Sequence, residues 1–234
     1  METSQSFIEH LEELRKRILL VIGFWVAGSV IVYFFSKQVL DYLILPLKSF
    51  QEKPIFTRPV EPFMAIFKIC VFGGGILTLP NTLIQIWLFI KPALMEKEKK
   101  VIKFMLSSFF FFFLAGMSFA FYLIVPLGLK VLFSFGKGSL KPLISIGSYL
   151  NFLLIFMTLL GLVFNLPVII GGLSSLGIIN PGILKEKRKF AFVGAFIISA
   201  ILTPTTDIFT QIFVAIPLIF LYEISILFSK IFKK

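Results

Sequence analysis

Long apolar runs separated by short polar segments dominate this chain of 234 residues. The runs lack the strict alternation of strands and the one-sided stripe of soluble helices. A bilayer core of ~30 Å needs about 20 apolar residues at helical rise, and lipid requires each span to pair its own backbone groups. The pattern therefore predicts an all-α integral membrane protein, one polytopic domain over 1–234 with spans at about 18–35, 63–90, 102–135, 149–176, 190–202 and 208–228.

Proline and glycine interrupt four of these six predicted spans. The interruptions are Gly73, Gly74, Gly75 and Pro80 in the second span, Pro126 in the third, Pro167 in the fourth and Pro217 in the sixth. Proline removes a backbone hydrogen bond and usually kinks a membrane helix. We therefore expect bent or broken helices that enclose a concavity.

Two segments have unusual lengths. The fifth span has so few apolar residues that it reaches only ~20–22 Å at helical rise, and the short linker "TPTTD" follows it. A span this short is expected to thin the lipid around it. The segment 36–62 is long and half apolar, so we expect a short helix lying along the outer surface.

Composition and charge agree with a membrane protein. Hydrophobic residues make up 58% of the chain and charged residues 15%, against about a quarter charged in soluble domains. Lysine and arginine are concentrated near the N-terminus, at 91–103, at 185–189 and at the C-terminus. This bias places both termini in the cytoplasm of a multi-pass protein of the cytoplasmic (inner) membrane. The basic residues lie beside spans, which favours anionic lipid over nucleic acid as their partner.

The sequence lacks the common catalytic motifs of enzymes. It has one cysteine and one histidine, His10, which lies outside every predicted span. Neither a glycine-rich nucleotide loop, a GxSxG nucleophile elbow nor a pair of aspartates within a span is present. We therefore expect a protein that is not an enzyme and needs no metal or cofactor.

A few polar residues lie inside predicted spans, where they are costly and usually face protein or a wet cavity. Gln85 and Gln211 are typical of hydrogen bonds between helices. Asn165 lies near the middle of the fourth span, where both a packing role and a functional role remain open. Glu223 lies near the cytoplasmic end of the sixth span and can pair with a nearby lysine.

Carboxylates at the membrane boundary are the less expected feature of a chain with a formal net charge of +11. On a helix, Glu12–Lys16 and Glu13–Arg17 are four residues apart and can form intrahelical ion pairs. A second acidic and basic cluster, "KPALMEKEKK", contains Glu96 and Glu98 on the same predicted side. These carboxylates can be solubilising partners of the cations, or they can receive a ligand with two neighbouring arginines.

Three segments carry a resemblance to a known family. They are "HLEELRKRIL" near the N-terminus, "QIWLFIKPALMEKEKK" after the second span and "GAFIISAILTPTTDIFTQIFVAIPLIFLYE" near the end. Together with the six-span layout they resemble the TatC family, the core receptor of the twin-arginine protein translocase. The resemblance covers nearly the whole chain.

The resemblance implies roles for particular residues. Glu13 and Glu98 are expected to contact the two arginines of a signal peptide, and Arg15 and Phe89 to shape that site. Asn165 stands where the family usually has glutamate, and an amide keeps hydrogen bonding there but cannot carry a charge. Pro46, in "ILPLKSF", matches a recurrent proline of the family's first outer loop. The third matched segment contains Asp207 of the outer turn between the short spans, Gln211 as part of an intramembrane polar site, and Glu223.

The function implied by the resemblance is that of a receptor and core component. Such a protein binds twin-arginine signal peptides of folded cargo and organises export driven by the proton gradient. Its implied fold is a bent, concave six-helix bundle with short fifth and sixth spans, and its implied partners are small single-span subunits of the TatA and TatB type, membrane lipid and further copies of itself. Two alternatives remain at this point, a small ion-coupled secondary transporter and a scaffold that gathers other membrane proteins.

Overall fold

The computed structural model describes residues 2–48, 50, 54–135, 143–202 and 208–232. All named elements in these ranges are helices, which agrees with the predicted all-α class. The chain divides into two compact units. Unit 1 comprises Met1–Leu43 and Arg58–Leu106, and unit 2 comprises Ile44–Thr57 and Ser107–Lys234.

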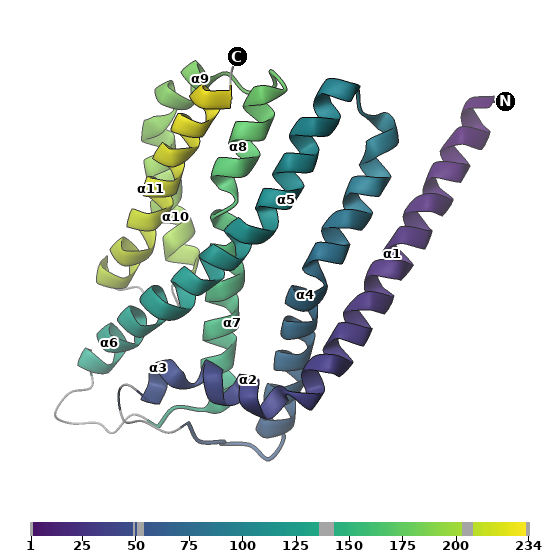
Figure 1. Ribbon diagram of the computed structural model, residues 1–234. Helices are drawn as coiled ribbons and strands as arrows, with labels where there is room; N and C mark the ends of the chain where they lie inside the picture. Colours follow the sequence, from purple (N-terminus) through teal and green to yellow (C-terminus); the bar gives the residue numbers. More distant parts are fainter. Residues whose placement is uncertain (1, 49, 51–53, 136–142, 203–207, 233–234) are drawn as a thin grey trace. The chain divides into compact units, whose positions relative to one another are not determined.

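Unit 1 is built on two long antiparallel helices that lie side by side (Figure 1). Its elements are α1 (Glu2–Phe34), α2 (Ser36–Leu43), α4 (Glu61–Ile90), the one-turn helix η1 (Lys91–Ala93) and the first part of α5 (Glu96–Phe119). The beginning of α1 therefore lies at the same end of unit 1 as the α4–α5 connection (Figure 1).

Small residues let α1 and α4 approach closely. A Cβ added to Gly28 of α1 would lie 3.1 Å from the carbonyl oxygen of Gly74, and one added to Gly74 would lie 2.6 Å from the backbone nitrogen of Ser29. Nearby, the indole Nε1 of Trp25 donates to the backbone oxygen of Val71 at 2.7 Å. Close backbone approach at small residues is typical of helix pairs within membranes.

Four helices in the described residues are long and apolar enough to cross a membrane. By length and composition they are Glu9–Phe34, Glu61–Ala93, Glu96–Ser134 and Ile146–Ser175. Many apolar side chains of α1 are exposed, including Ile18, Leu19 and Val26, as expected of a helix that faces lipid. The six-span count and the cytoplasmic position of the termini remain predictions.

Unit 2 contains the remaining helices. These are α3 (Leu45–Lys48), the rest of α5, the π-helical segment η2 (Ala120–Ile124), α6 (Val125–Phe135), α7 (Ile146–Val163), α8 (Leu166–Ser175), α9 (Pro181–Glu186), α10 (Arg188–Leu202) and α11 (Ile208–Phe232). In this unit α11 packs against α8 and α10. An isolated β-bridge joins Ile55 to Ser145, just before α7 begins.

The expectation of bent or broken helices holds for two of the four interrupted spans. The third span changes from α- to π-helix at η2, which ends two residues before Pro126. The fourth ends at Val163 and resumes at Leu166, next to Pro167, whose missing N–H cannot continue the hydrogen-bond ladder. By contrast, α4 and α11 continue through Pro80 and Pro217 without an interruption. Whether these two bend, and whether the helices enclose a concavity, remains a prediction.

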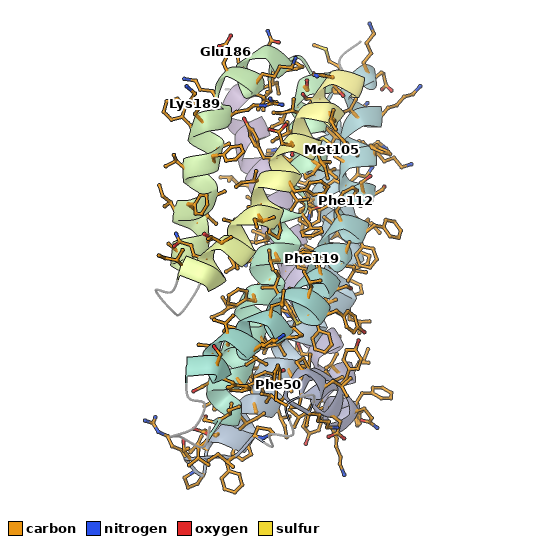
Figure 2. All side chains as sticks on the ribbon, turned by 90° about the vertical axis from the view of Figure 1, so that its left-hand side faces the viewer. Phe50, Met105, Phe112, Phe119, Glu186 and Lys189 are labelled. Carbon is orange, nitrogen blue, oxygen red and sulfur yellow. The ribbon has the colours of Figure 1, made fainter. Side chains whose placement is uncertain are left out.

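The helices extend beyond several predicted spans. The first predicted span begins at 18, whereas α1 begins at Glu2 and includes the acidic and basic segment. The outer segment forms α2 and α3, so its helical character is confirmed, and the buried Pro46 lies in α3. Just after α3 lies Phe50, which Figure 2 labels. Its ring packs edge-to-face on that of Phe133 in α6, with ring centroids 5.2 Å apart. The short helix α9 was not expected, and Asp207 lies outside the described residues.

Candidate functional site

The carboxylate of Glu13 is held by its own helix. Its Oε1 accepts a hydrogen bond from Nε of Arg17 at 2.9 Å and a second from the Nη2 of the same guanidinium. The predicted pair four residues apart is therefore confirmed for Glu13, whereas Glu12 and Lys16 form no ion pair within the described part of the chain. The Oε2 of Glu13 faces Nδ1 of His10 at 3.8 Å, and 35% of the side chain is exposed.

Two contacts link this part of α1 to the last turns of α4. Arg17 donates through Nη1 to Oε1 of Gln85 at 3.2 Å. His10 stacks on the ring of Phe89, with centroids 4.6 Å apart and planes 20° from parallel. Gln85 thus forms the interhelical hydrogen bond that its position inside a span predicted. Arg17 as its partner was not predicted.

Glu98 lies in the first turn of α5 and caps it. Its Oε2 accepts a hydrogen bond from the backbone N–H of Met95 at 2.9 Å. Glu98 is the third residue of α5 and Met95 the residue before the helix, so this bond satisfies a backbone donor at the helix N-terminus. The neighbouring Glu96 is much more exposed and pairs with Lys99, whose Nζ lies 2.6 Å from Oε1. Two carboxylates of the same helical turn therefore have different roles: Glu98 caps the helix and Glu96 forms a surface ion pair.

Each of the two carboxylates that the sequence singled out keeps one accessible acceptor. Glu98 is half-buried, and among the described residues its Oε1 makes no hydrogen bond. Oε2 of Glu13 has only the distant His10. Both residues belong to unit 1, on α1 and at the start of α5.

The other two predicted residues of this site also lie in unit 1. Phe89 is half-buried under His10, and Arg15 is exposed, without an ion pair or hydrogen bond to the described residues. Unit 1 therefore contains all four predicted residues. It adds three that sequence reasoning did not assign to the site: His10, Arg17 and Gln85. The four-residue spacing of Arg17 from Glu13 could have assigned Arg17 to the site. The sequence did not indicate which helix Gln85 would contact.

The predicted intramembrane polar site, Asn165 and Gln211, lies in unit 2. Asn165 is fully buried at the break between α7 and α8, where its Nδ2 donates to the backbone oxygen of Gly161 at 2.8 Å. Its Oδ1 is buried without a hydrogen-bond partner. The amide thus satisfies one carbonyl of the broken helix and leaves an acceptor unpaired. A buried acceptor of this kind is costly without a donor.

Gln211 and Glu223 both connect α11 to α10. Nε2 of Gln211 donates to the backbone oxygen of Phe196 at 3.0 Å, which confirms the expected interhelical bond. Glu223 accepts from Nη2 of Arg188 at 2.6 Å. The expectation of a lysine partner was wrong, because Arg188 at the start of α10 lies opposite Glu223 in the antiparallel pair.

Comparison with known proteins gives a consistent result over nearly the whole chain. The family described as Sec-independent protein translocase protein (TatC) matches residues 9–217. The TatC protein of Carboxydothermus hydrogenoformans is 39% identical over 228 residues, covering 97% of this chain and 94% of that protein. The TatC protein of Aquifex aeolicus is 38% identical over 227 residues, covering 95% and 94%.

Solved structures agree in fold. A crystal structure described as the twin arginine translocase receptor TatC superposes with a TM-score of 0.79 at 37% identity, covering 96% of this chain and 100% of that one. A second structure of this receptor, in DDM, gives 0.80 at 38% identity and covers 93% and 98%.

Proposed function

Because this chain belongs to the TatC family of Sec-independent protein translocase proteins, we propose that it is the receptor subunit of a twin-arginine translocase. In this proposal Glu13 and Glu98 receive the paired arginines of a signal peptide on folded cargo. Arg15 and Phe89 shape the surface around them.

The observation that carries the proposal is the accessible oxygen on each carboxylate. Neither residue is fully consumed by internal bonds, because Oε2 of Glu13 and Oε1 of Glu98 remain without a close donor in the described part of unit 1. A guanidinium presents five N–H donors in a planar fork, so one ligand arginine can approach each carboxylate.

Arg17 limits how Glu13 binds. Because both Nε and Nη2 of Arg17 already donate to Oε1, a ligand arginine meets Oε2 and shares the carboxylate. This arrangement favours a directional N–H donor over a general positive charge. A lysine ammonium lacks the planar fork, so we expect a twin-lysine peptide to bind more weakly.

A peptide-binding experiment tests the proposal. The purified protein in zwitterionic nanodiscs is titrated with a fluorescent twin-arginine signal peptide and with its twin-lysine counterpart. A hydrogen bond to a charged group contributes ~1.5–3 kcal/mol, so Glu13→Gln and Glu98→Gln should each weaken twin-arginine binding by about 10- to 100-fold.

Two neighbouring carboxylates serve as matched controls. Glu12→Gln and Glu96→Gln remove the same charge from the same helices, and both side chains are exposed. Their affinities should stay within about threefold of the unsubstituted protein, as expected for weak exposed pairs. Equal binding of the two peptides, or equal losses in all four variants, would contradict the assignment.

The partner subunits are proposed from the polar residues of unit 2. Small single-span subunits of the TatA and TatB type would meet this chain near Gln211 or supply the donor that Oδ1 of Asn165 lacks. Asn165 is fully buried, so a partner helix would reach it only after α7, α8 and their neighbours separate. Further copies of this chain are a second proposed partner, and the proton gradient is the proposed energy source.

A further inference from the structure

The carboxylate oxygen that the proposed function assigns to a ligand arginine faces the one histidine of the chain. Nδ1 of His10 lies 3.8 Å from Oε2 of Glu13, three residues further along α1. This distance is longer than a hydrogen bond, so the imidazole does not occupy the oxygen. Arg17 donates only to the other oxygen, Oε1. A ring nitrogen and a carboxylate oxygen without a close donor therefore face each other.

The partner helix holds both of these groups in place. The ring of His10 stacks on Phe89 of α4, with centroids 4.6 Å apart and planes 20° from parallel. Arg17, which is bonded to Glu13, also donates through Nη1 to Gln85 of α4. Although 52% of the His10 side chain is exposed, the stacking fixes the orientation of the ring. The nitrogen and the oxygen are thus positioned before a ligand arrives.

The protonation state of His10 decides what these two groups can bind. A neutral imidazole has one nitrogen that accepts a hydrogen bond, whereas both nitrogens of the protonated ring donate. Histidine side chains change between these states near pH 6.5. A neutral ring therefore leaves Oε2 of Glu13 open and adds a second acceptor. A protonated ring is a cation at ion-pair distance from Glu13, and it competes for the same oxygen.

Glu13 is the charged group through which the protonation of His10 acts. On the same helix, Arg17 pairs with the far oxygen of Glu13. The sequence neighbour Glu9 is exposed and forms no ion pair with the described residues of unit 1. From α4, the side chain that faces the imidazole is the ring of Phe89, which does not titrate.

We propose that His10 is a specificity-determining residue of the peptide site, and that its neutral imidazole accepts a second hydrogen bond from the arginine bound by Glu13. This inference rests on the proposed function. A guanidinium presents several N–H groups in one plane, so it can donate to Oε2 of Glu13 and to Nδ1 of His10 together. Affinity is full above the range in which histidine titrates. It falls as the pH drops through that range, because protonation removes the acceptor and places a second cation beside Glu13.

A pH profile of peptide binding tests this role. The full chain in zwitterionic nanodiscs is titrated with a twin-arginine peptide that lacks histidine, from about pH 8 to about pH 5.5, where carboxylates stay ionised. The affinity of the unsubstituted protein should fall by about 3- to 10-fold over this range. Glu12→Gln is the matched control, because Glu12 is exposed on the same helix and lies outside the proposed site. Its profile should match that of the unsubstituted protein.

Two substitutions of His10 separate its acceptor from its ring. His10→Phe keeps an aromatic ring on Phe89 but has no acceptor and no charge. Its affinity at about pH 8 should be about 2- to 10-fold weaker, with a level pH profile. His10→Gln has an amide oxygen that accepts but does not titrate. It should recover part of the lost affinity and also give a level profile.

The histidine itself gives a second measurement. Because the chain has one histidine, isotope-labelled imidazole gives a single residue's signal in magnetic resonance. Saturating twin-arginine peptide at about pH 6.5 should move this signal toward the neutral position, since a ligand that binds the neutral form favours it. Movement toward the protonated position would contradict the proposal.

Three results of the binding experiment would overturn the role of His10. They are a level profile in the unsubstituted protein, the same fall with pH in His10→Phe, and an undiminished affinity of His10→Phe at about pH 8. A preference for twin-arginine over twin-lysine peptide, measured on the same samples at the upper pH, would then leave the proposed function standing. Absence of that preference would overturn both.

Discussion

In the proposed peptide site, Glu13 would contact both its own helix and the ligand. One of its oxygens is occupied by Arg17, and that arginine also bonds to Gln85 across the helix pair. The internal partner fixes the carboxylate and orients the second oxygen. In our proposal, specificity for a guanidinium would therefore depend on Gln85, which bonds to Arg17 and contacts neither Glu13 nor the ligand.

Gln85→Ala tests this indirect role. Loss of one hydrogen bond to Arg17 costs ~0.5–1.5 kcal/mol, so twin-arginine affinity should fall by about 2- to 10-fold, with a smaller preference over twin-lysine. Titration of the two peptides measures both quantities. Thr82→Ala is the control, since the Thr82 hydroxyl donates within α4 itself, to the backbone oxygen of Thr78. An unchanged peptide preference in Gln85→Ala would contradict the role.

For individual residues, the sequence predicted side-chain pairs within one helix and missed pairs between helices. Spacing along one helix was enough to predict Glu13 with Arg17. The stacking of His10 on Phe89 and the bond from Arg17 to Gln85 depend on the register of α1 against α4, which no local pattern encodes. The prediction of a lysine partner for Glu223 was wrong because it too depended on the register between two helices, which places Arg188 opposite Glu223.

At the scale of elements, α1 and α4 are held by close backbone contact. A methyl group at Gly74 would meet the backbone of Ser29, which cannot move aside as a flexible side chain can. The pairing therefore depends on the absence of a side chain at this position.

Gly74→Ala should destabilise unit 1. Overpacking typically costs ~1–3 kcal/mol, so the midpoint of denaturant unfolding in micelles should fall. Gly23→Ala in α1 is the control, because an added Cβ there meets nothing within 4 Å. That variant should be neutral or slightly more stable, since alanine favours helix. Equal midpoints for Gly74→Ala and Gly23→Ala would argue against close packing.

The length of α10 carries a separate prediction. Its 15 residues reach only ~22 Å, which should thin the adjacent lipid. Inserting about four leucines, or ~6 Å, should impair transport of folded cargo into membrane vesicles and leave peptide docking intact. The same number of residues inserted at 136–142 should affect neither. Unimpaired transport by the lengthened α10 would count against thinning.

The sequence predicted where the long helices occur, but it predicted only some of their interruptions. Apolar length predicted each long helix, and Pro126 and Pro167 marked real changes of helix geometry. Pro80 and Pro217 did not interrupt their helices, because neighbouring packing can support a backbone group that proline leaves unpaired. The α9 helix was missed since six residues carry too little periodicity.

For the whole molecule, the distribution of charge is the main evidence on orientation. The basic segments at the N-terminus, 91–103 and 185–189 contrast with fewer cations at 37–58 and 137–141. This distribution and an even number of spans predict that both termini face the cytoplasm.

Cysteine labelling tests this orientation. In a Cys70→Ser background, which removes the one buried cysteine, an impermeant maleimide added to intact cells should label Arg58→Cys and Lys141→Cys. It should not label Gln5→Cys or Lys189→Cys until the cells are lysed. Labelling of Lys189→Cys before lysis would contradict the six-span topology.

The cap formed by Glu98 allows the proposed peptide binding to be followed by hydrogen exchange. Its Oε2 protects the amide hydrogen of Met95. A peptide that draws this oxygen away would expose that hydrogen to deuterium, whereas one that uses Oε1 would leave the exchange rate unchanged. Deuterium uptake at the Met95 amide, measured by mass spectrometry, thus distinguishes a peptide that binds Oε2 of Glu98 from one that binds Oε1.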